Sequence, residues 1–169
     1  NDYIAIAYLR LGQFEKSREK YNENINLSPD EKGNNLLMIA ESYYNEEKFA
    51  EAKKYYKQVY DTEKNKELKK KAFYSLILVA NAMNDSNELI KLSNSFRKEY
   101  PNSDYQEEIS YMLASNYEIN GMSEKALIEY ETLYNMTTDK DTKEETVKRI
   151  MEMLYNKKDY ENAKMYFEK

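Results

Sequence analysis

The sequence predicts an all-helical fold built from pairs of antiparallel helices. Three Gly and two Pro in 169 residues are too few for a sheet with many turns. Apolar residues recur at steps of three and four, the spacing that places side chains on one face of a helix. The same pattern returns several times along the chain, which indicates a repeat architecture.

The clearest unit lies between Ile39 and Tyr60, where two amphipathic segments flank a polar break at residues 46–48. Small residues let two antiparallel helices approach closely, and aromatic residues fill the wider gaps beside them. The positions that form the shared face are Ala40 and Tyr43, then Phe49, Ala52, Tyr56 and Val59. Neither helix could bury its apolar stripe alone, so the pair is the expected structural unit.

Other stretches of the chain repeat this unit but keep only some of its apolar and aromatic positions. The expected repeats span about residues 1–28, 29–63, 64–100, 101–137 and 138–169. The aromatic that follows the small residue of each second helix is Tyr21, Tyr56, Phe96, Tyr130 or Phe167, with spacings of 35, 40, 34 and 37 residues. In the third repeat Leu92 takes the place of the small residue. Side-chain caps are expected at Ser28 with Glu31, Ser103 with Gln106, and Thr142 with Glu145.

A period close to 34 residues with this pattern resembles the tetratricopeptide repeat (TPR). The first-helix motif A-x-x-Y occurs at Ala5 and Tyr8, Ala40 and Tyr43, and Ala114 and Tyr117. The second-helix motif A-x-x-x-[FY] occurs at Ala52 and Tyr56, Ala126 and Tyr130, and Ala163 and Phe167. The resemblance implies one TPR-like solenoid over residues 1–169, a right-handed superhelix of about five repeats and about ten helices.

Composition argues against catalysis and nucleic-acid binding. The chain has no Cys and no His, so thiolate nucleophiles, the usual zinc sites and the commonest proton-transfer side chain are missing. Its net charge of -5 disfavours a surface that neutralises phosphates. The longest nearly apolar run, Leu76 to Met83, is far too short to span a bilayer. We therefore expect that the chain has no catalytic activity, binds no cofactor or metal ion, and contains no transmembrane segment.

In such a solenoid the first helices line the concave face, so their free sides are the candidates for partner contact. These expected groove residues are Leu37, Glu41, Tyr44, Tyr74, Ile77, Asn81, Tyr111, Ser115, Glu118, Lys148, Glu152 and Tyr155. Chaperone-binding relatives hold a C-terminal carboxylate with Lys, Arg and Asn at fixed first-helix positions, where this chain has mostly Leu, Glu, Tyr, Ser and Ile, and Asn81 is the only partial match. A positively charged or mixed protein or peptide segment fits this aromatic and acidic face better.

The main functional hypothesis is a non-catalytic scaffold that binds a peptide, helix or folded partner in the groove. The stretch Phe96 to Tyr117 also resembles the junction in two bacterial envelope TPR proteins, the barrel-assembly lipoprotein and the Tol-Pal-associated protein. That resemblance implies a subunit of an envelope complex and favours the periplasm over the cytoplasm. A third alternative is an accessory TPR domain of a larger enzyme or regulator.

The sequence begins without Met and stops inside the second helix of the fifth unit, so we expect a piece of a longer protein. Incomplete terminal repeats should leave apolar side chains open at both ends. We expect Ile4, Tyr166 and Phe167 to be partly exposed and to support self-association through the ends.

Overall fold

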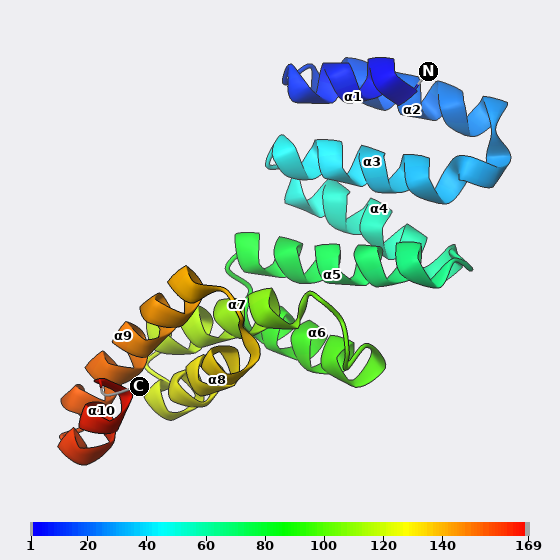
Figure 1. The fold of residues 1–169 in the computed structure, drawn as a ribbon. Coiled ribbons are helices and arrows are strands. Elements are labelled where there is room, and N and C mark those ends of the chain that lie inside the picture. The colour runs from blue at the N-terminus through cyan, green and yellow to red at the C-terminus, as the bar shows by residue number, and fades with distance from the viewer. Residues whose placement is uncertain (1, 168–169) are drawn as a thin grey trace. The chain divides into compact units, whose positions relative to one another are not determined.

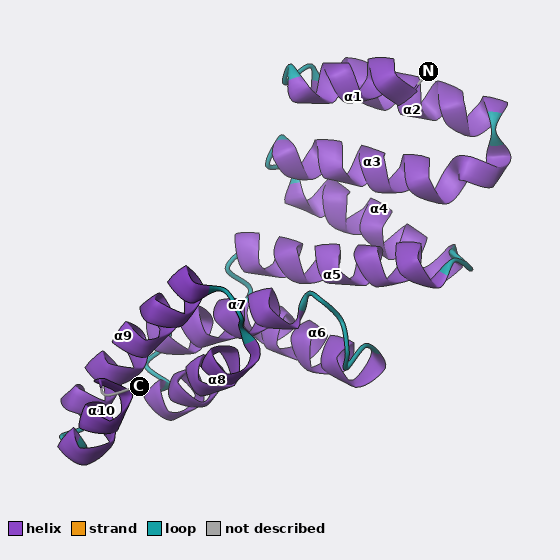
Figure 2. Cartoon of the chain, in the orientation of Figure 1, coloured by secondary structure: helices purple, strands orange, loops and turns teal. Residues whose placement is uncertain are grey.

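The computed structural model describes residues 2–167, and this part of the chain forms ten α-helices and one short 3-10 helix (Figures 1 and 2). No strand occurs within it. The helices are α1 (Asp2–Arg10), α2 (Phe14–Leu27), η1 (Pro29–Glu31), α3 (Lys32–Asn45), α4 (Phe49–Thr62), α5 (Lys66–Ala82), α6 (Ser86–Glu99), α7 (Gln106–Ile119), α8 (Ser123–Met136), α9 (Lys140–Asn156) and α10 (Tyr160–Phe167). The predicted fold class and helix number are thus confirmed.

The chain divides into two compact units, one ending at Phe96 and the other beginning at Arg97. In the first unit α1 packs on α2 and α3 on α4, while each second helix also packs on the first helix of the next pair, α2 on α3 and α4 on α5. The second unit repeats this scheme with α7 on α8, α8 on α9, and α9 on α10. Each unit is therefore held together by contacts between neighbouring helices.

Every helix pair is joined by a turn of the same geometry. One residue in each turn has a positive φ: Gly12 (70°), Glu47 (59°), Asn84 (54°), Gly121 (70°) and Lys158 (62°). The Glu47 N–H donates to the Tyr44 carbonyl at 2.9 Å, and the Lys48 N–H donates to the Tyr43 carbonyl at 2.9 Å. The equivalent two hydrogen bonds occur in the other four turns. This is the Schellman motif, which satisfies carbonyls at the end of the first helix.

The common turn sets the register of the second helices. They begin at Phe14, Phe49, Ser86, Ser123 and Tyr160, two residues after the positive-φ residue, with spacings of 35, 37, 37 and 37 residues. The expected spacings of 40 and 34 around the third repeat were wrong, because Phe96 is not equivalent to Tyr56. Counting from the helix start, Ser93 is equivalent to Tyr56, and Leu89 rather than Leu92 takes the small-residue position. Leu89 and Ser93 are both fully buried, whereas Leu92 is half-buried.

The core of the first unit is shared by three successive helices. Leu36 and Ala40 of α3, Ala52 and Tyr56 of α4, and Leu76 of α5 belong to one buried cluster. A chain of rings extends this core, with Tyr60 and Phe73 at 4.7 Å between centroids and Phe73 and Phe96 at 5.4 Å. Burial of this apolar area is the main force that stacks one pair on the next.

The expected caps were wrong at three helix starts. The Ser28 side chain makes no capping hydrogen bond, because Pro29–Glu31 forms a 3-10 turn and α3 begins after it. Ser103 and Gln106 do not form a capping box; the Gln106 side chain instead donates to the Tyr100 carbonyl at 2.7 Å. Thr142 lies inside α9, whose cap is Asp139, accepting from the Thr142 N–H at 2.8 Å.

The first prediction concerns the positive-φ turns. Replacing Glu47 or Lys158 with Gly should raise the free energy of unfolding by about 0.5–1 kcal/mol, because a left-handed conformation strains any residue with a Cβ. Gly121→Ala should lower it by about 1 kcal/mol through the backbone alone, since an added Cβ would meet no atom within 4 Å. Urea denaturation measures these changes. Lys157→Gly is the matched control: its φ of -76° is right-handed, so stability should fall there. A loss of stability in Glu47→Gly would contradict the account.

The second prediction compares two fully buried serines of second helices. The Ser17 hydroxyl donates to the Ala5 carbonyl at 2.9 Å, whereas the Ser93 hydroxyl has no hydrogen-bond partner among residues 2–167. Ser93→Ala should therefore raise the free energy of unfolding by about 1 kcal/mol, and Ser17→Ala should lower it by about 1 kcal/mol. Thermal or urea unfolding of the two variants tests this, and a change of the same sign in both would refute it.

Candidate functional site

The first helices of the first unit leave a row of side chains open to solvent. On α3 these residues are spaced by four, three and four, and they are Asn34, Met38, Glu41 and Asn45. On α5 the equivalent residues that are exposed or half-buried are Lys71, Leu78 and Ala82. Such spacing places each set along one face of its helix.

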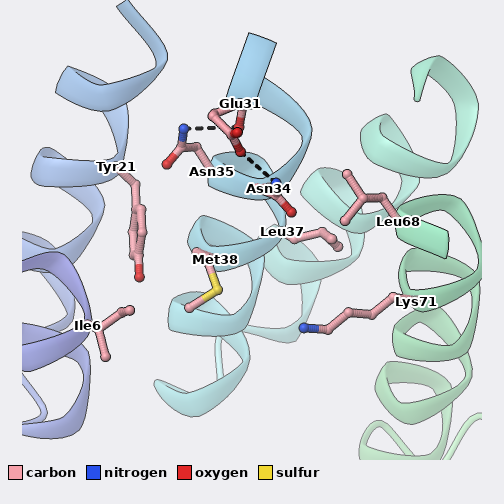
Figure 3. A pocket seen from close by; sticks show the side chains of 9 residues that line it. All are labelled: Ile6, Tyr21, Glu31, Asn34, Asn35, Leu37, Met38, Leu68 and Lys71. Atoms are coloured by element: carbon pink, nitrogen blue, oxygen red, sulfur yellow. Dashed lines mark hydrogen bonds between the residues drawn. The ribbon is translucent and has the colours of Figure 1, made fainter. Parts of the chain in front are cut away.

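A cavity of about 260 Å³ opens among α1, α2, α3 and α5 (Figure 3). Its apolar lining includes Ile6, Met38 and Leu68. Asn34 and Lys71 contribute polar groups, and the Lys71 ammonium extends toward α3 (Figure 3). The cavity can therefore receive an apolar side chain while offering polar groups beside it.

Hydrogen bonds around Glu31 fix the polar side of this cavity. The Asn34 side chain donates to the Glu31 carboxylate at 2.7 Å, and the Asn35 side chain donates to the Glu31 carbonyl at 3.0 Å (Figure 3). These two hydrogen bonds fix the orientation of the Asn34 and Asn35 side chains in the cavity wall.

Three of the residues predicted for the groove are buried in this unit. Tyr74 is 6% exposed and Ile77 0%, so these two offer almost no surface to a docked partner, whereas Leu37, although only 3% exposed, lines the cavity. Leu37 lies in the core shared by α3, α4 and α5, and the Tyr74 ring lies 6.4 Å from the Phe96 ring.

The remaining predicted residues of the first unit reach the surface. Glu41 and Tyr44 are half-buried and Asn81 is exposed. The Tyr44 ring packs edge-on against Phe49 at 5.4 Å, so part of it supports the turn. Sequence reasoning missed Asn34, Met38 and Lys71. Stepping back from Glu41 by three and by seven along the helix would have found the first two.

In the second unit all the predicted groove residues have exposed or half-buried side chains. Tyr111, Ser115 and Glu118 lie on α7, and Lys148, Glu152 and Tyr155 lie on α9. Tyr111 is 44% exposed and Tyr155 is 65% exposed. Tyr155 also contacts Tyr160 across the turn, with 5.3 Å between ring centroids. This places it in the role that Tyr44 has beside Phe49.

Glu118 has a structural partner as well as an exposed position. The buried Tyr130 hydroxyl donates to its carboxylate at 2.8 Å. Burial, followed by this hydrogen bond and the charge of Glu118, raises the pKa of Tyr130 above its ordinary value. Arg149 lies 3.9 Å from Glu118 and 3.7 Å from Glu152. The acidic character expected of this face is therefore partly neutralised.

Residues 2–167 contain no group of three or more acidic, His or Cys side chains placed to hold a metal ion. Within the same range, no helix combines the length and apolar character needed to cross a bilayer.

The third prediction concerns the Tyr130–Glu118 hydrogen bond. Tyr130→Phe should lower the free energy of unfolding by about 1–2 kcal/mol, because it removes a hydroxyl that donates to a carboxylate. A double-mutant cycle with Glu118→Ala should recover most of that loss as coupling. Glu152→Ala serves as the control partner and should give a coupling near zero. A coupling near zero for Glu118 as well would show that the bond contributes nothing.

Comparison with known proteins supports the fold. Residues 35–65 match the Tetratricopeptide repeat family, and no curated protein matches the sequence. The solved structure of the TPR-like repeats of a putative kinesin light chain from Podosopora anserina is 13% identical, with a TM-score of 0.70 over 99% of this chain and 90% of that one.

Two bacterial proteins are similar in structure. BtubC (BKLC) from P. vanneervenii is 13% identical, with a TM-score of 0.74 over 96% of this chain and 73% of that one. MamA from Desulfovibrio magneticus RS-1 is 17% identical, with a TM-score of 0.69 over 98% of this chain and 88% of that one. At such low identities the likeness establishes the fold alone. The chain therefore has the fold of a helical-repeat protein, and one stretch of it, residues 35–65, matches the Tetratricopeptide repeat family.

Proposed function

We propose that this chain is a non-catalytic scaffold that binds a segment of another protein on its first-helix faces. The observation that carries the proposal is the cavity in the first unit, because side chains of three successive first helices, α1, α3 and α5, meet there. A surface made by equivalent helices of successive repeats suits a ligand that runs along them, such as an extended peptide or a helix.

The chemistry of the two faces favours a partner segment of mixed charge with an apolar anchor. In the first unit the cavity offers Ile6, Met38 and Leu68 to an apolar side chain, while Lys71 suits an acidic neighbour. In the second unit Tyr111, Glu152 and Tyr155 offer aromatic area and a carboxylate, which suit a basic or amphipathic side chain.

The fourth prediction tests this proposal with charge reversals. Peptides selected from a random display library against the whole chain should lose binding by about tenfold or more when Glu41→Lys and Glu152→Lys are combined, because both changes lie on first helices. The matched control combines Glu51→Lys and Glu161→Lys, which reverse exposed carboxylates of second helices. This control should bind the peptides as the unchanged chain does. Isothermal titration calorimetry gives the affinities, and circular dichroism checks that each variant stays helical.

An equal loss of peptide affinity in the two double variants, or a loss of affinity in the control alone, would show that the first-helix faces are not the binding site. Glu118 is left unchanged in the design because its carboxylate holds the Tyr130 hydroxyl, so a substitution there would mix binding with stability.

None of the solved structures named above is one of the two envelope proteins whose junction the sequence resembles. The envelope subunit and the accessory domain of a larger protein therefore stay predictions of the sequence.

A further inference from the structure

The turn between α7 and α8 contains the one Asn–Gly pair of the sequence, Asn120 and Gly121. Both residues are exposed, and a Cβ added at Gly121 would meet no atom within 4 Å, so water reaches the pair freely. Asn is a thermolabile residue, and it loses its side-chain amide fastest before Gly, which has no side chain to hinder its backbone nitrogen. The composition of this turn thus favours a covalent change.

The reaction needs only the solvent. A base takes the N–H proton of Gly121, and the nitrogen forms a bond to Cγ of Asn120. The Cγ–Nδ2 bond breaks, and ammonia leaves with that proton, so that a succinimide ring remains. Water then opens one of the two C–N bonds of the ring, and the product is Asp or isoaspartate.

The folded turn opposes the first step. Asn120 has a ψ of 9°, so the Gly121 nitrogen nearly eclipses the Asn120 nitrogen instead of the Cβ, as ring closure requires. The Gly121 N–H also donates to the Glu118 carbonyl at 3.0 Å. The Asn120 side-chain amide donates to the Asn116 carbonyl at 2.7 Å. Both the attacking nitrogen and the departing nitrogen are therefore held apart by hydrogen bonds.

A buried tyrosine secures this arrangement through Glu118. The Glu118 carbonyl accepts the Gly121 N–H, while its carboxylate accepts the Tyr130 hydroxyl at 2.8 Å. Tyr130 lies on α8 and is 3% exposed. The Tyr130–Glu118 hydrogen bond thus ties the last turn of α7 to the helix that follows, and its loss would make the Gly121 N–H easier to release.

We propose that Asn120 is a deamidation site, and that the reaction proceeds only when the turn held by Tyr130 opens. Neither product restores the turn. Asp places a negative charge at the C-terminus of α7, where the helix dipole is unfavourable to it, and has no amide hydrogen for the Asn116 carbonyl. Isoaspartate adds a carbon to the backbone before Gly121 and so disrupts the spacing of the turn hydrogen bonds. The change is irreversible, and it is independent of the proposed binding function.

The first test compares folded and unfolded protein. The whole chain is incubated with and without urea at one pH and temperature, and mass spectrometry of its peptides follows the conversion of Asn120. The folded chain should convert about tenfold more slowly or less, because the turn must open first. Asn120→Gln is the control: its longer side chain needs a larger ring, so position 120 should stay an amide in both states. Equal rates with and without urea would show that the turn does not control the reaction, and no conversion in urea would show that Asn120 is not a site.

The second test compares two Tyr–Glu hydrogen bonds of the same unit. Ile4 and Phe167 are exposed as expected, but Tyr166 is only 8% exposed, so that expectation was wrong. The Tyr166 hydroxyl donates to Glu131 at 3.1 Å, and its ring lies 5.7 Å from Tyr134. Tyr166→Phe therefore removes a similar bond that is not attached to the α7–α8 turn, and it serves as the matched control for Tyr130→Phe.

Tyr130→Phe should speed the conversion of Asn120 in the folded chain by about tenfold, because it removes a hydrogen bond to a charged group beside the turn. Tyr166→Phe should leave the rate close to that of the unchanged chain. Equal acceleration in the two variants would mean that unfolding of the whole unit, and not opening of this turn, controls the reaction. No acceleration in Tyr130→Phe would likewise overturn the proposal.

Discussion

The left-handed residue between the two helices of each pair is the constraint on which the rest of the structure depends. It reverses the chain within a short turn and starts the second helix two residues later in all five pairs. The fourth residue of the second helix is consequently always the one that meets the first helix. Ser17, Ala52, Leu89 and Ala126 are fully buried there, and Ala163 is 9% exposed. A fixed turn thus converts a loosely repeated sequence into a strictly repeated packing.

The same register explains which surfaces stay open. The eighth residue of the second helix is buried in the first four pairs, whether it is Tyr or Ser. In α3 the neighbouring helices cover most of the circumference, which leaves a narrow exposed or half-buried strip.

The sequence predicted the fold class and the repeats that keep Ala and Tyr in place, because size and spacing there agree with the packing. The sequence prediction failed in the third repeat. There the large Leu89 occupies the position of a small residue and the small Ser93 occupies the position of an aromatic residue, so the pattern was aligned on Phe96 instead. In the candidate site it named Tyr74 and Ile77, which are buried. A helix that packs on several neighbours buries most of its circumference, and the A-x-x-Y spacing alone cannot tell which narrow strip remains free.

The most direct test of this account is the backbone φ angle at the five turn residues, measured in solution by NMR from scalar couplings and chemical shifts. The account predicts a positive φ at Gly12, Glu47, Asn84, Gly121 and Lys158, with right-handed helical values resuming two residues later. The non-glycine positions are decisive, since their sequence does not demand this conformation. A negative φ at Glu47, Asn84 or Lys158 would contradict the common turn, and with it the register from which the core and the first-helix faces are argued.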